Sequence, residues 1–200
     1  MPVISSSRQK GFALASISVA CLVIAGCGGS SSGSAPVDTL KGLAATGAAL
    51  ANASVTAKCV TGSPIVGTTA ADGTFTLSLA GGQTAPCILQ ATGGAPSVTL
   101  YSFATQPGWV NVTPLTDLAV TKALGMDPAA AFAVFDAAKA GVIGTGLATA
   151  KAYVNTQINA ITGSTPSVDI MTGVFAVGDA NDKVLDKLAA ASKLAGKTLS

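Results

Sequence analysis

The residues that usually carry catalysis are nearly absent from this sequence. The chain of 200 residues contains no His, and beyond residue 26 it contains no Arg and no Glu, so the charged side chains there are nine Asp and nine Lys. The commonest general base, the usual zinc ligand and the bidentate clamp for phosphate or carboxylate are therefore missing. A hydrolase that uses Asp and Lys remains a distant alternative. The composition favours a protein that is not an enzyme and needs no metal and no cofactor.

The N-terminal segment has the layout of a secretory signal peptide. Arg8 and Lys10 form a positive start, and the 16 residues from Gly11 to Gly26 carry no charge. As a helix these residues would cover roughly 24 Å, which is less than the hydrocarbon core of a bilayer at about 30 Å. We therefore expect residues 1–26 to be cleaved off rather than to remain as a transmembrane helix.

The end of this segment, Ile24-Ala25-Gly26-Cys27, resembles the lipobox of bacterial lipoproteins. The resemblance implies cleavage before Cys27, diacylglycerol on its sulfur and usually an acyl group such as palmitate on the new amine, and several acyl chains make a stable membrane anchor. In that family an Asp directly after the cysteine retains the protein in the inner membrane. Gly28 stands there instead, which favours the periplasmic or surface face of the outer membrane. The alternative is an ordinary signal peptide with a chance cysteine.

The four cysteines have different fates under this interpretation. Cys21 leaves with the signal peptide and Cys27 carries the lipid, so Cys59 and Cys87 remain. In an oxidising envelope compartment two such thiols most simply form a disulfide, which the chain-entropy relation values at ~3 to 4 kcal/mol. A metal or redox pair is the alternative, but the spacing is not CxxC and no His is present.

Removing residues 1–26 leaves 174 residues with balanced charge, enough for one domain or two small ones. Because nucleic-acid binding depends on a basic surface, we expect no nucleic-acid partner. Residues 27–36 comprise the lipidated cysteine and a Gly/Ser tether, with a random-coil reach of about 15 to 18 Å.

Residues 37–112 have the texture of a β-domain. Short alternating or β-branched segments are separated by Gly, Pro and Asp-Gly turn signals. The clearest segment is Thr74 to Leu79, preceded by Asp72-Gly73, a strong hairpin signal because a tight turn there needs positive φ. We predict strands at 38–44, 53–60, 65–70, 74–80, 86–92, 97–104 and 109–112, and we place Cys59 and Cys87 inside two of them.

Three stretches of this domain resemble the carboxypeptidase regulatory-like, or transthyretin-like, module. They are Leu40-Lys41-Gly42, the segment from Gly47 to Val55, and the segment from Thr69 to Leu77 with its T-x-x-D-G-x-F-x-L pattern. The resemblance covers roughly residues 37–104 and implies a seven-stranded Greek-key β-sandwich. It supplies no active-site residues, and the cysteine pair is not part of its general pattern.

Residues 113–200 change to helical periodicity. Asn111 to Pro114 resembles a capped helix start, and the apolar spacing then predicts a helix that ends at Gly125. We predict a second helix from Asp127 to Gly141, a third that ends at Gly163, an irregular stretch at 165–178 with a short extended piece at Asp169-Ile170-Met171, and a fourth helix from about Asn181 to Gly196. The fold class is therefore α+β, with about four helices after the sandwich. A looser similarity to uncharacterised bacterial lipoproteins implies the same architecture.

Few residues of this chain are candidates for a binding site. Asp179 to Asp182 provides oxygen ligands at close spacing but departs from the calcium-loop template, so helix capping is favoured over metal binding. Tyr101, Phe103 and Trp109 form a candidate ligand surface for a sugar ring, although strand aromatics are more often core. The Lys/Asp alternation of the last helix is typical of a solvated face.

Short helices need a surface to pack on. We expect these helices to fold back on the β-domain and to leave the three aromatic residues at the seam, with the contact made through Leu115, Leu118, Phe132, Phe135, Val154 and Ile158.

Two function classes follow from the sequence. The chain is a non-enzymatic envelope lipoprotein that binds a glycan or protein partner at the membrane surface, or it is a structural subunit of an outer-membrane or envelope protein complex.

Overall fold

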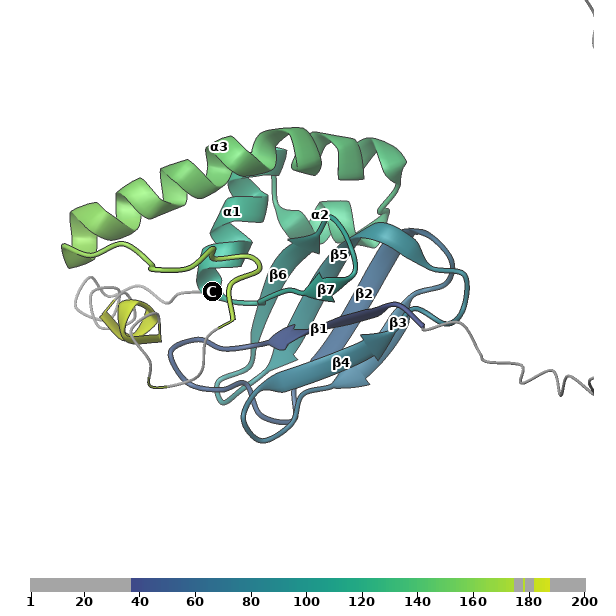
Figure 1. Ribbon diagram of the computed structural model, residues 1–200, viewed down its shortest axis with the longest axis horizontal. Helices are drawn as coiled ribbons and strands as arrows, with labels where there is room; N and C mark the ends of the chain where they lie inside the picture. Colours follow the sequence, from purple (N-terminus) through teal and green to yellow (C-terminus); the bar gives the residue numbers. More distant parts are fainter. Residues whose placement is uncertain (1–36, 175–177, 179–181, 188–200) are drawn as a thin grey trace, which may run out of the picture. The chain divides into compact units, whose positions relative to one another are not determined.

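The strands precede the helices along the chain, giving an α+β fold (Figure 1). The computed structural model describes residues 37–174, 178 and 182–187. These residues belong to one compact unit, Ala35–Ser200. The strands are β1 (Thr39–Leu43), β2 (Ser54–Thr61), β3 (Ile65–Thr68), β4 (Thr74–Ser78), β5 (Thr84–Gly93), β6 (Val98–Ala104) and β7 (Gly108–Trp109), and the helices are α1 (Pro114–Leu124), α2 (Pro128–Ala133) and α3 (Ala137–Thr162), with a further helical segment at 182–187.

The predicted strands are all present, and the strands make two sheets. One sheet has the order β4-β1-β7 and the other β3-β2-β5-β6. β1 pairs antiparallel with β4 and parallel with β7. β7 is shorter than the predicted 109–112, but the chain stays beside β1, since Val110 donates its N–H to the Lys41 carbonyl and Val112 donates to the Leu43 carbonyl, both at 2.8 Å.

The turn at Asp72-Gly73 forms as the residues require but does not close a hairpin within one sheet. Gly73 has φ of 81°, and the Asp72 carboxylate accepts the N–H and hydroxyl of Thr74 at 3.0 and 2.7 Å. The strands on either side, β3 and β4, belong to different sheets, so the turn carries the chain from one layer to the other.

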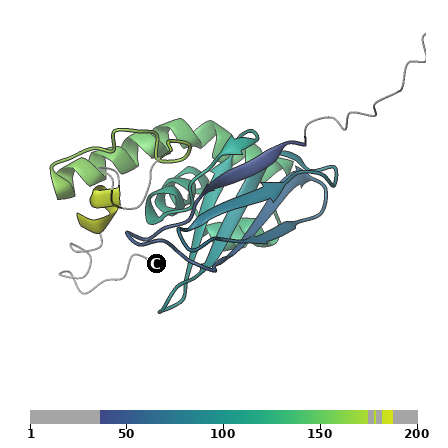
Figure 2. The same ribbon diagram turned by 60° about the horizontal axis from the view of Figure 1, so that its bottom comes forward.

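The four-stranded sheet is covered on both faces. Alternate side chains of its strands, such as Val55, Ala57 and Leu89, point to the three-stranded sheet and build the core between the sheets. The opposite face carries Ile88, Tyr101 and Phe103, which form a second core with the helices. Figure 2 shows α1 and α3 gathered on one side of the strands. Helices and strands therefore share a core.

Helix α1 also covers the edge of β6. Thr113 is its N-cap, and Thr113 and Thr116 form a capping box. Pro114 in the first turn also favours a helix start at this position. The Thr116 hydroxyl donates to the Tyr101 carbonyl at 3.0 Å, and the Tyr101 N–H donates to Asp117 Oδ1 at 2.9 Å. Two helical side chains thereby pair the backbone groups of an edge strand, which would otherwise be open to another chain.

Lys58 joins α2 to the sheet. Its Nζ, which projects from β2, donates to the carbonyls of Phe132 and Ala133 at 2.8 and 3.3 Å and lies 4.4 Å from the centre of the Phe132 ring. A cation at a helix C-terminus is favourable because the last carbonyls there have no helical partner.

Two details of the helix prediction were wrong. The second helix does not run to Gly141, because α2 ends at Ala133 and Asp136 caps the start of α3 through the Lys139 N–H at 2.8 Å. Gly141 lies inside α3, which continues to its left-handed cap at Gly163. Leu118 does not enter the contact with the sheet and is 40% exposed, whereas Leu115, Phe132, Val154 and Ile158 are buried as expected.

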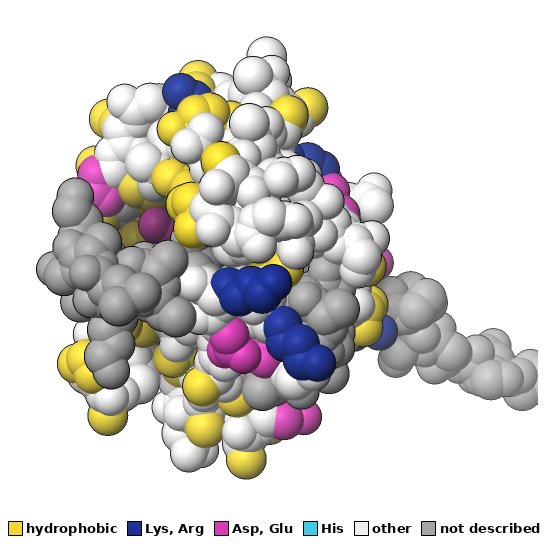
Figure 3. All heavy atoms as spheres, turned by 90° about the vertical axis from the view of Figure 1, so that its left-hand side faces the viewer, with side chains coloured by type: hydrophobic (Ala, Val, Ile, Leu, Met, Phe, Trp, Pro, Cys, Tyr) yellow, Lys and Arg dark blue, Asp and Glu magenta, His cyan; other side chains and the backbone are white. Residues whose placement is uncertain are grey.

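The segment after α3 is not extended at 169–171. Asp169 to Gly173 forms a turn closed by the Gly173 N–H and the Asp169 carbonyl at 2.7 Å. The cluster Asp179 to Asp182 lies mostly outside the described residues. In the helical segment 182–187, Lys183, Asp186 and Lys187 are exposed, and charged side chains of both signs gather in the middle of the face seen in Figure 3. In the described part of the chain, no helix is long and apolar enough to cross a membrane.

Candidate functional site

Trp109 lies on the outer face of the three-stranded sheet, away from the helices. Lys41 is the register partner of Trp109 on β7 and of Thr76 on β4, so the three side chains share one face and form a row across the sheet. Neighbouring strands are about 4.8 Å apart, which gives this row a span of roughly 10 Å. Lys41 and Thr76 are exposed and Trp109 is partly exposed.

The indole of Trp109 is fixed by a buried asparagine. Its Nε1 donates to Asn111 Oδ1 at 2.7 Å. Asn111 is fully buried and donates its backbone N–H to the Met171 carbonyl at 2.7 Å and its Nδ2 to the Gly173 and Ile170 carbonyls at 2.8 and 3.3 Å. Because the ring nitrogen is already paired, the group that Trp109 can still offer to a ligand is the face of its ring.

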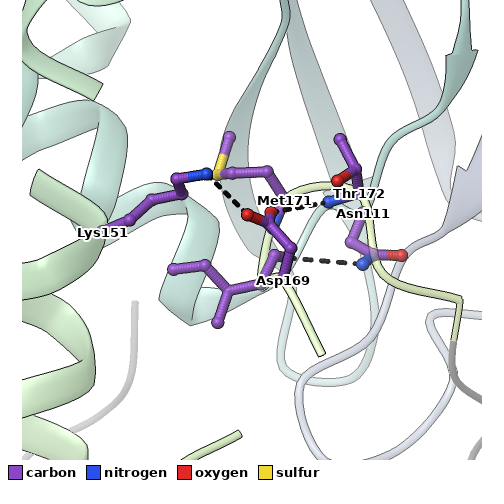
Figure 4. A network of polar contacts seen from close by, with 6 residues as sticks. Asn111, Lys151, Asp169, Met171 and Thr172 are labelled. Carbon is purple, nitrogen blue, oxygen red and sulfur yellow. Dashed lines mark hydrogen bonds and ion pairs between the residues drawn. The ribbon is translucent and has the colours of Figure 1, made fainter. Parts of the chain in front are cut away.

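The turn that holds Asn111 is itself tied to α3 (Figure 4). Asp169 Oδ1 accepts the N–H groups of Met171 and Thr172 at 2.8 and 3.1 Å, and Oδ2 accepts Lys151 Nζ at 2.5 Å. Burial alone would raise the pKa of the Asp169 carboxyl, but these hydrogen bonds, above all that of Lys151, hold its pKa below the ordinary value. A chain of polar contacts therefore runs from α3 through the turn to the indole.

The exposed surface around this row is polar. The positions on the same face of the sheet as Lys41 include three hydroxyl side chains beside the row, those of Thr39, Thr74 and Ser78, of which that of Thr74 donates to the Asp72 carboxylate. Among the described residues Lys41 has no ion pair, whereas Lys139 pairs with Asp136 and Lys151 with Asp169. This face can offer a ring, one cation and several hydroxyl groups.

Tyr101 and Phe103 do not share that surface. Tyr101 is 7% exposed and Phe103 is 1% exposed, and both lie in the core beneath the helices. Tyr101 packs against Phe132 with ring centres 5.7 Å apart, and Phe103 packs against Phe135 at 6.4 Å. Their burial argues against a stacking platform made of all three aromatic residues, because Trp109 is the one of the three whose side chain is partly exposed to solvent.

Cys59 and Cys87 form a disulfide between β2 and β5. The two residues are direct register partners and point into the core between the sheets. The bridge is therefore a structural link within the four-stranded sheet. Cys27 lies outside the described residues.

Two hollows of the described surface lie away from this row. An open hollow of about 410 Å³ lies beside the second half of α3 and is lined by Asn155, Thr156, Asn159, Ala160 and Thr165. A smaller space beside the 166–170 segment has about 10 Å³, which is at the lower limit for one water molecule. Within the described ranges, no group of three or more Cys, His, Asp or Glu side chains could hold a metal ion.

Sequence reasoning identified Trp109 but missed the residue that holds its indole and the residues that lie beside it on the sheet. The stretch Asn111 to Pro114 was expected to cap a helix, and Thr113 does so, but no sequence signal indicated that Asn111 would hold the indole. Lys41 and Thr76 could be recognised only from the sheet register, since they lie 68 and 33 positions from Trp109 in the sequence. Comparison with known proteins finds no matching family, no matching curated protein and no matching solved structure.

Proposed function

We propose that this chain is a bacterial envelope lipoprotein that is anchored through Cys27 and acts without catalysis as a binding module at the membrane surface. The observation that carries the proposal is Ile24-Ala25-Gly26-Cys27 at the end of an uncharged segment. The Gly/Ser-rich residues 28–36 suit a tether between lipid and domain. The solvent-facing Trp109 row supports the binding role, because aromatic side chains on an exposed face commonly make contacts with ligands.

The anchor can be tested by fatty-acid labelling. Cells that express the full-length chain are given radiolabelled palmitate, and the wild type and a Cys21→Ser control are expected to incorporate label while Cys27→Ser does not. Equal labelling of the wild type and Cys27→Ser would contradict the anchor. Gly28→Asp should shift the labelled protein from the outer to the inner membrane fraction, as the lipoprotein resemblance implies.

We further propose that the sandwich is transthyretin-like. Seven strands divided between sheets of three and four, and the Asp72-Gly73 turn that carries the chain between them, support this assignment. The helices that cover the four-stranded sheet would then be an addition to the family pattern.

A structural role in an envelope complex is the second candidate. It is favoured by α3, whose exposed side chains include Val142, Tyr153 and Ile161, at 52, 41 and 54% exposure. Exposed apolar side chains of this size are common at protein interfaces when they form a patch. Crosslinking of intact envelopes followed by affinity purification tests this role, since a structural subunit should recover one protein in constant ratio.

A hydrolase that uses Asp and Lys gains little support. In the described residues the Lys–Asp ion pairs are Lys139–Asp136 and Lys151–Asp169. Both carboxylates also accept backbone N–H groups, at a helix start and in a turn, so both pairs have a local structural role.

A further inference from the structure

The Trp109 row differs from the rest of the described surface in the combination of groups that it presents. Trp109 is the only tryptophan of the chain. Its ring nitrogen is paired with Asn111. Lys41 lies beside it on β1 without an ion pair among the described residues, and Thr76 lies beyond Lys41 on β4.

We propose that the outer face of the three-stranded sheet binds an acidic polysaccharide, with a sugar ring against the face of Trp109 and a sugar carboxylate paired with Lys41. The hydroxyl groups of Thr76 and its neighbours Thr39 and Ser78 would bond to sugar hydroxyls. The inference rests on the proposed role as a binding module, although not on the lipid anchor.

The ring contact follows from the electronic structure of the indole. Aromatic rings carry partial negative charge on their faces, which attracts the weakly positive C–H groups on one side of a sugar ring. Such contacts need a ring held in a fixed orientation, because ordering a mobile side chain on binding costs entropy. The bond to Asn111, and the bonds of Asn111 to the 170–173 segment, provide that preorganisation.

The charge of the face selects an acidic ligand. Lys41 is the charged side chain among the outward positions of β1, β4 and β7. The Asp72 carboxylate, in the turn before β4, is already paired with the N–H and hydroxyl of Thr74. A single cation is too little for nucleic acid, which is bound by clusters of Lys and Arg. A protein partner would be expected to meet further large apolar side chains around the tryptophan. The outward positions of β1 and β4 carry Lys41, the buried Leu43 and four hydroxyl side chains, those of Thr39, Thr74, Thr76 and Ser78. The hydroxyl-rich setting favours a carbohydrate with carboxylate groups.

Because Trp109 is the sole tryptophan, its fluorescence reports directly on this surface. The full-length protein in detergent is titrated with alginate oligosaccharide, a polymer of uronic acids, and in parallel with a neutral dextran oligosaccharide of the same length. We expect a saturable change in Trp109 emission with alginate and none with dextran. Added salt should weaken the alginate response, since the lysine contact is exposed to solvent.

Two matched lysine variants separate a site from a general charge effect. Lys41→Gln should raise the dissociation constant for alginate about three- to tenfold, as expected for loss of one charged hydrogen bond at an exposed position. Lys183→Gln removes the same charge from the exposed surface of the 182–187 segment and should leave the constant unchanged. Circular dichroism of both variants confirms that the fold is retained.

Trp109→Phe tests the ring contact by calorimetry, and its thermal melting is measured alongside. Weaker alginate binding at unchanged melting temperature supports the stacking role, and unchanged binding overturns it. The site is also overturned by no saturable alginate signal, by an equal response to dextran, or by equal constants for Lys41→Gln and Lys183→Gln. The lipid anchor is judged separately. If the protein binds alginate but takes up no palmitate, the binding site stands and the lipoprotein proposal fails. If it takes up palmitate but does not bind alginate, the lipoprotein proposal stands and the binding site fails.

Discussion

At the scale of single residues, Asp117 is a carboxyl group whose pKa is strongly shifted by its surroundings. It lies partly buried on α1 and accepts the Tyr101 N–H at 2.9 Å. Burial raises the pKa of Asp117 to about 6 against the lowering effect of this bond, and the negative charge of Asp127 raises it further. The folded protein therefore holds a proton on Asp117 at acidities where the unfolded chain has already released it.

The sign of the pH dependence follows from this shift. With a folded-state pKa above the unfolded value, the folded state binds more protons between about pH 4 and pH 6, so the free energy of unfolding falls as pH rises through that window. Asp117→Asn keeps the acceptor oxygen without the charge. We expect the variant to be more stable than the wild type by ~1 to 2 kcal/mol at neutral pH, after allowance for solvent screening, and equal to it near pH 4.

Urea denaturation at several pH values measures this difference. Asp136→Asn serves as the control of opposite sign, because the Lys139 N–H and ammonium hold the pKa of Asp136 below its ordinary value. Its charged form is the favoured one, so the control should lose stability at neutral pH and lose none in acid. A gain for Asp117→Asn that does not change with pH would refute the burial explanation.

At the scale of elements, the contact of α1 with α3 depends on a glycine. A Cβ at Gly146 would lie 3.1 to 3.3 Å from the backbone and side chain of Ala123, whereas a Cβ at Gly144 would meet no atom within 4 Å. Both glycines lie inside the same helix. Gly146 is therefore needed for close helix packing, and Gly144 is not.

This contrast predicts opposite effects of one substitution. Gly146→Leu should destabilise the protein by about 1 to 3 kcal/mol, because the larger side chain must push α1 and α3 apart. Gly144→Leu should be neutral or stabilising by up to about 1 kcal/mol, since leucine is the better helix former. Thermal unfolding of the two variants tests this prediction. Equal melting temperatures would show that α1 and α3 can move apart without loss of stability.

The strands were predictable because their signals are local. Alternating side chains and turn residues indicate a strand whatever it packs against, and each of the seven predicted segments overlaps a strand. The end of the second helix was predicted wrongly because Gly141 has open space around its Cβ position and carries no positive φ. The residue that marks the boundary is Asp136, because it caps the start of α3 and so separates α3 from α2.

The candidate surface was predictable only in part. Trp109 could be proposed as a residue type, but its partners Lys41 and Thr76 come from strands far away in the sequence. In the sequence, Tyr101 and Phe103 cannot be distinguished from Trp109, since all three are aromatic residues in predicted strands. A strand that is covered on both faces has no solvent-exposed side, and the sequence alone does not reveal that cover. Only the position of the helices places these two rings in the core.

At the scale of the whole molecule, the four-stranded sheet is the middle layer between two cores. Its inner face packs against the three-stranded sheet and its outer face against the helices. Removing the helices would uncover Ile88, Tyr101 and Phe103, each buried at present. The β-domain and the helices should therefore unfold together rather than as separate domains.

The single tryptophan allows this cooperativity to be measured in one sample. Trp109 emission follows the three-stranded sheet, while circular dichroism at the helical band follows α1 and α3. In urea we expect the two signals to give coincident transitions with the same midpoint, because the four-stranded sheet shares one core with the three-stranded sheet and a second core with the helices. Asn111 also ties the tryptophan strand to the turn after α3. Asn111→Ala should lower the common midpoint, since it leaves the buried carbonyl of Ile170 and the partly buried carbonyl of Gly173 without their side-chain donor. If the helical signal were lost at lower urea while Trp109 emission stayed native, the helices would be an independent layer and the shared core would not control stability.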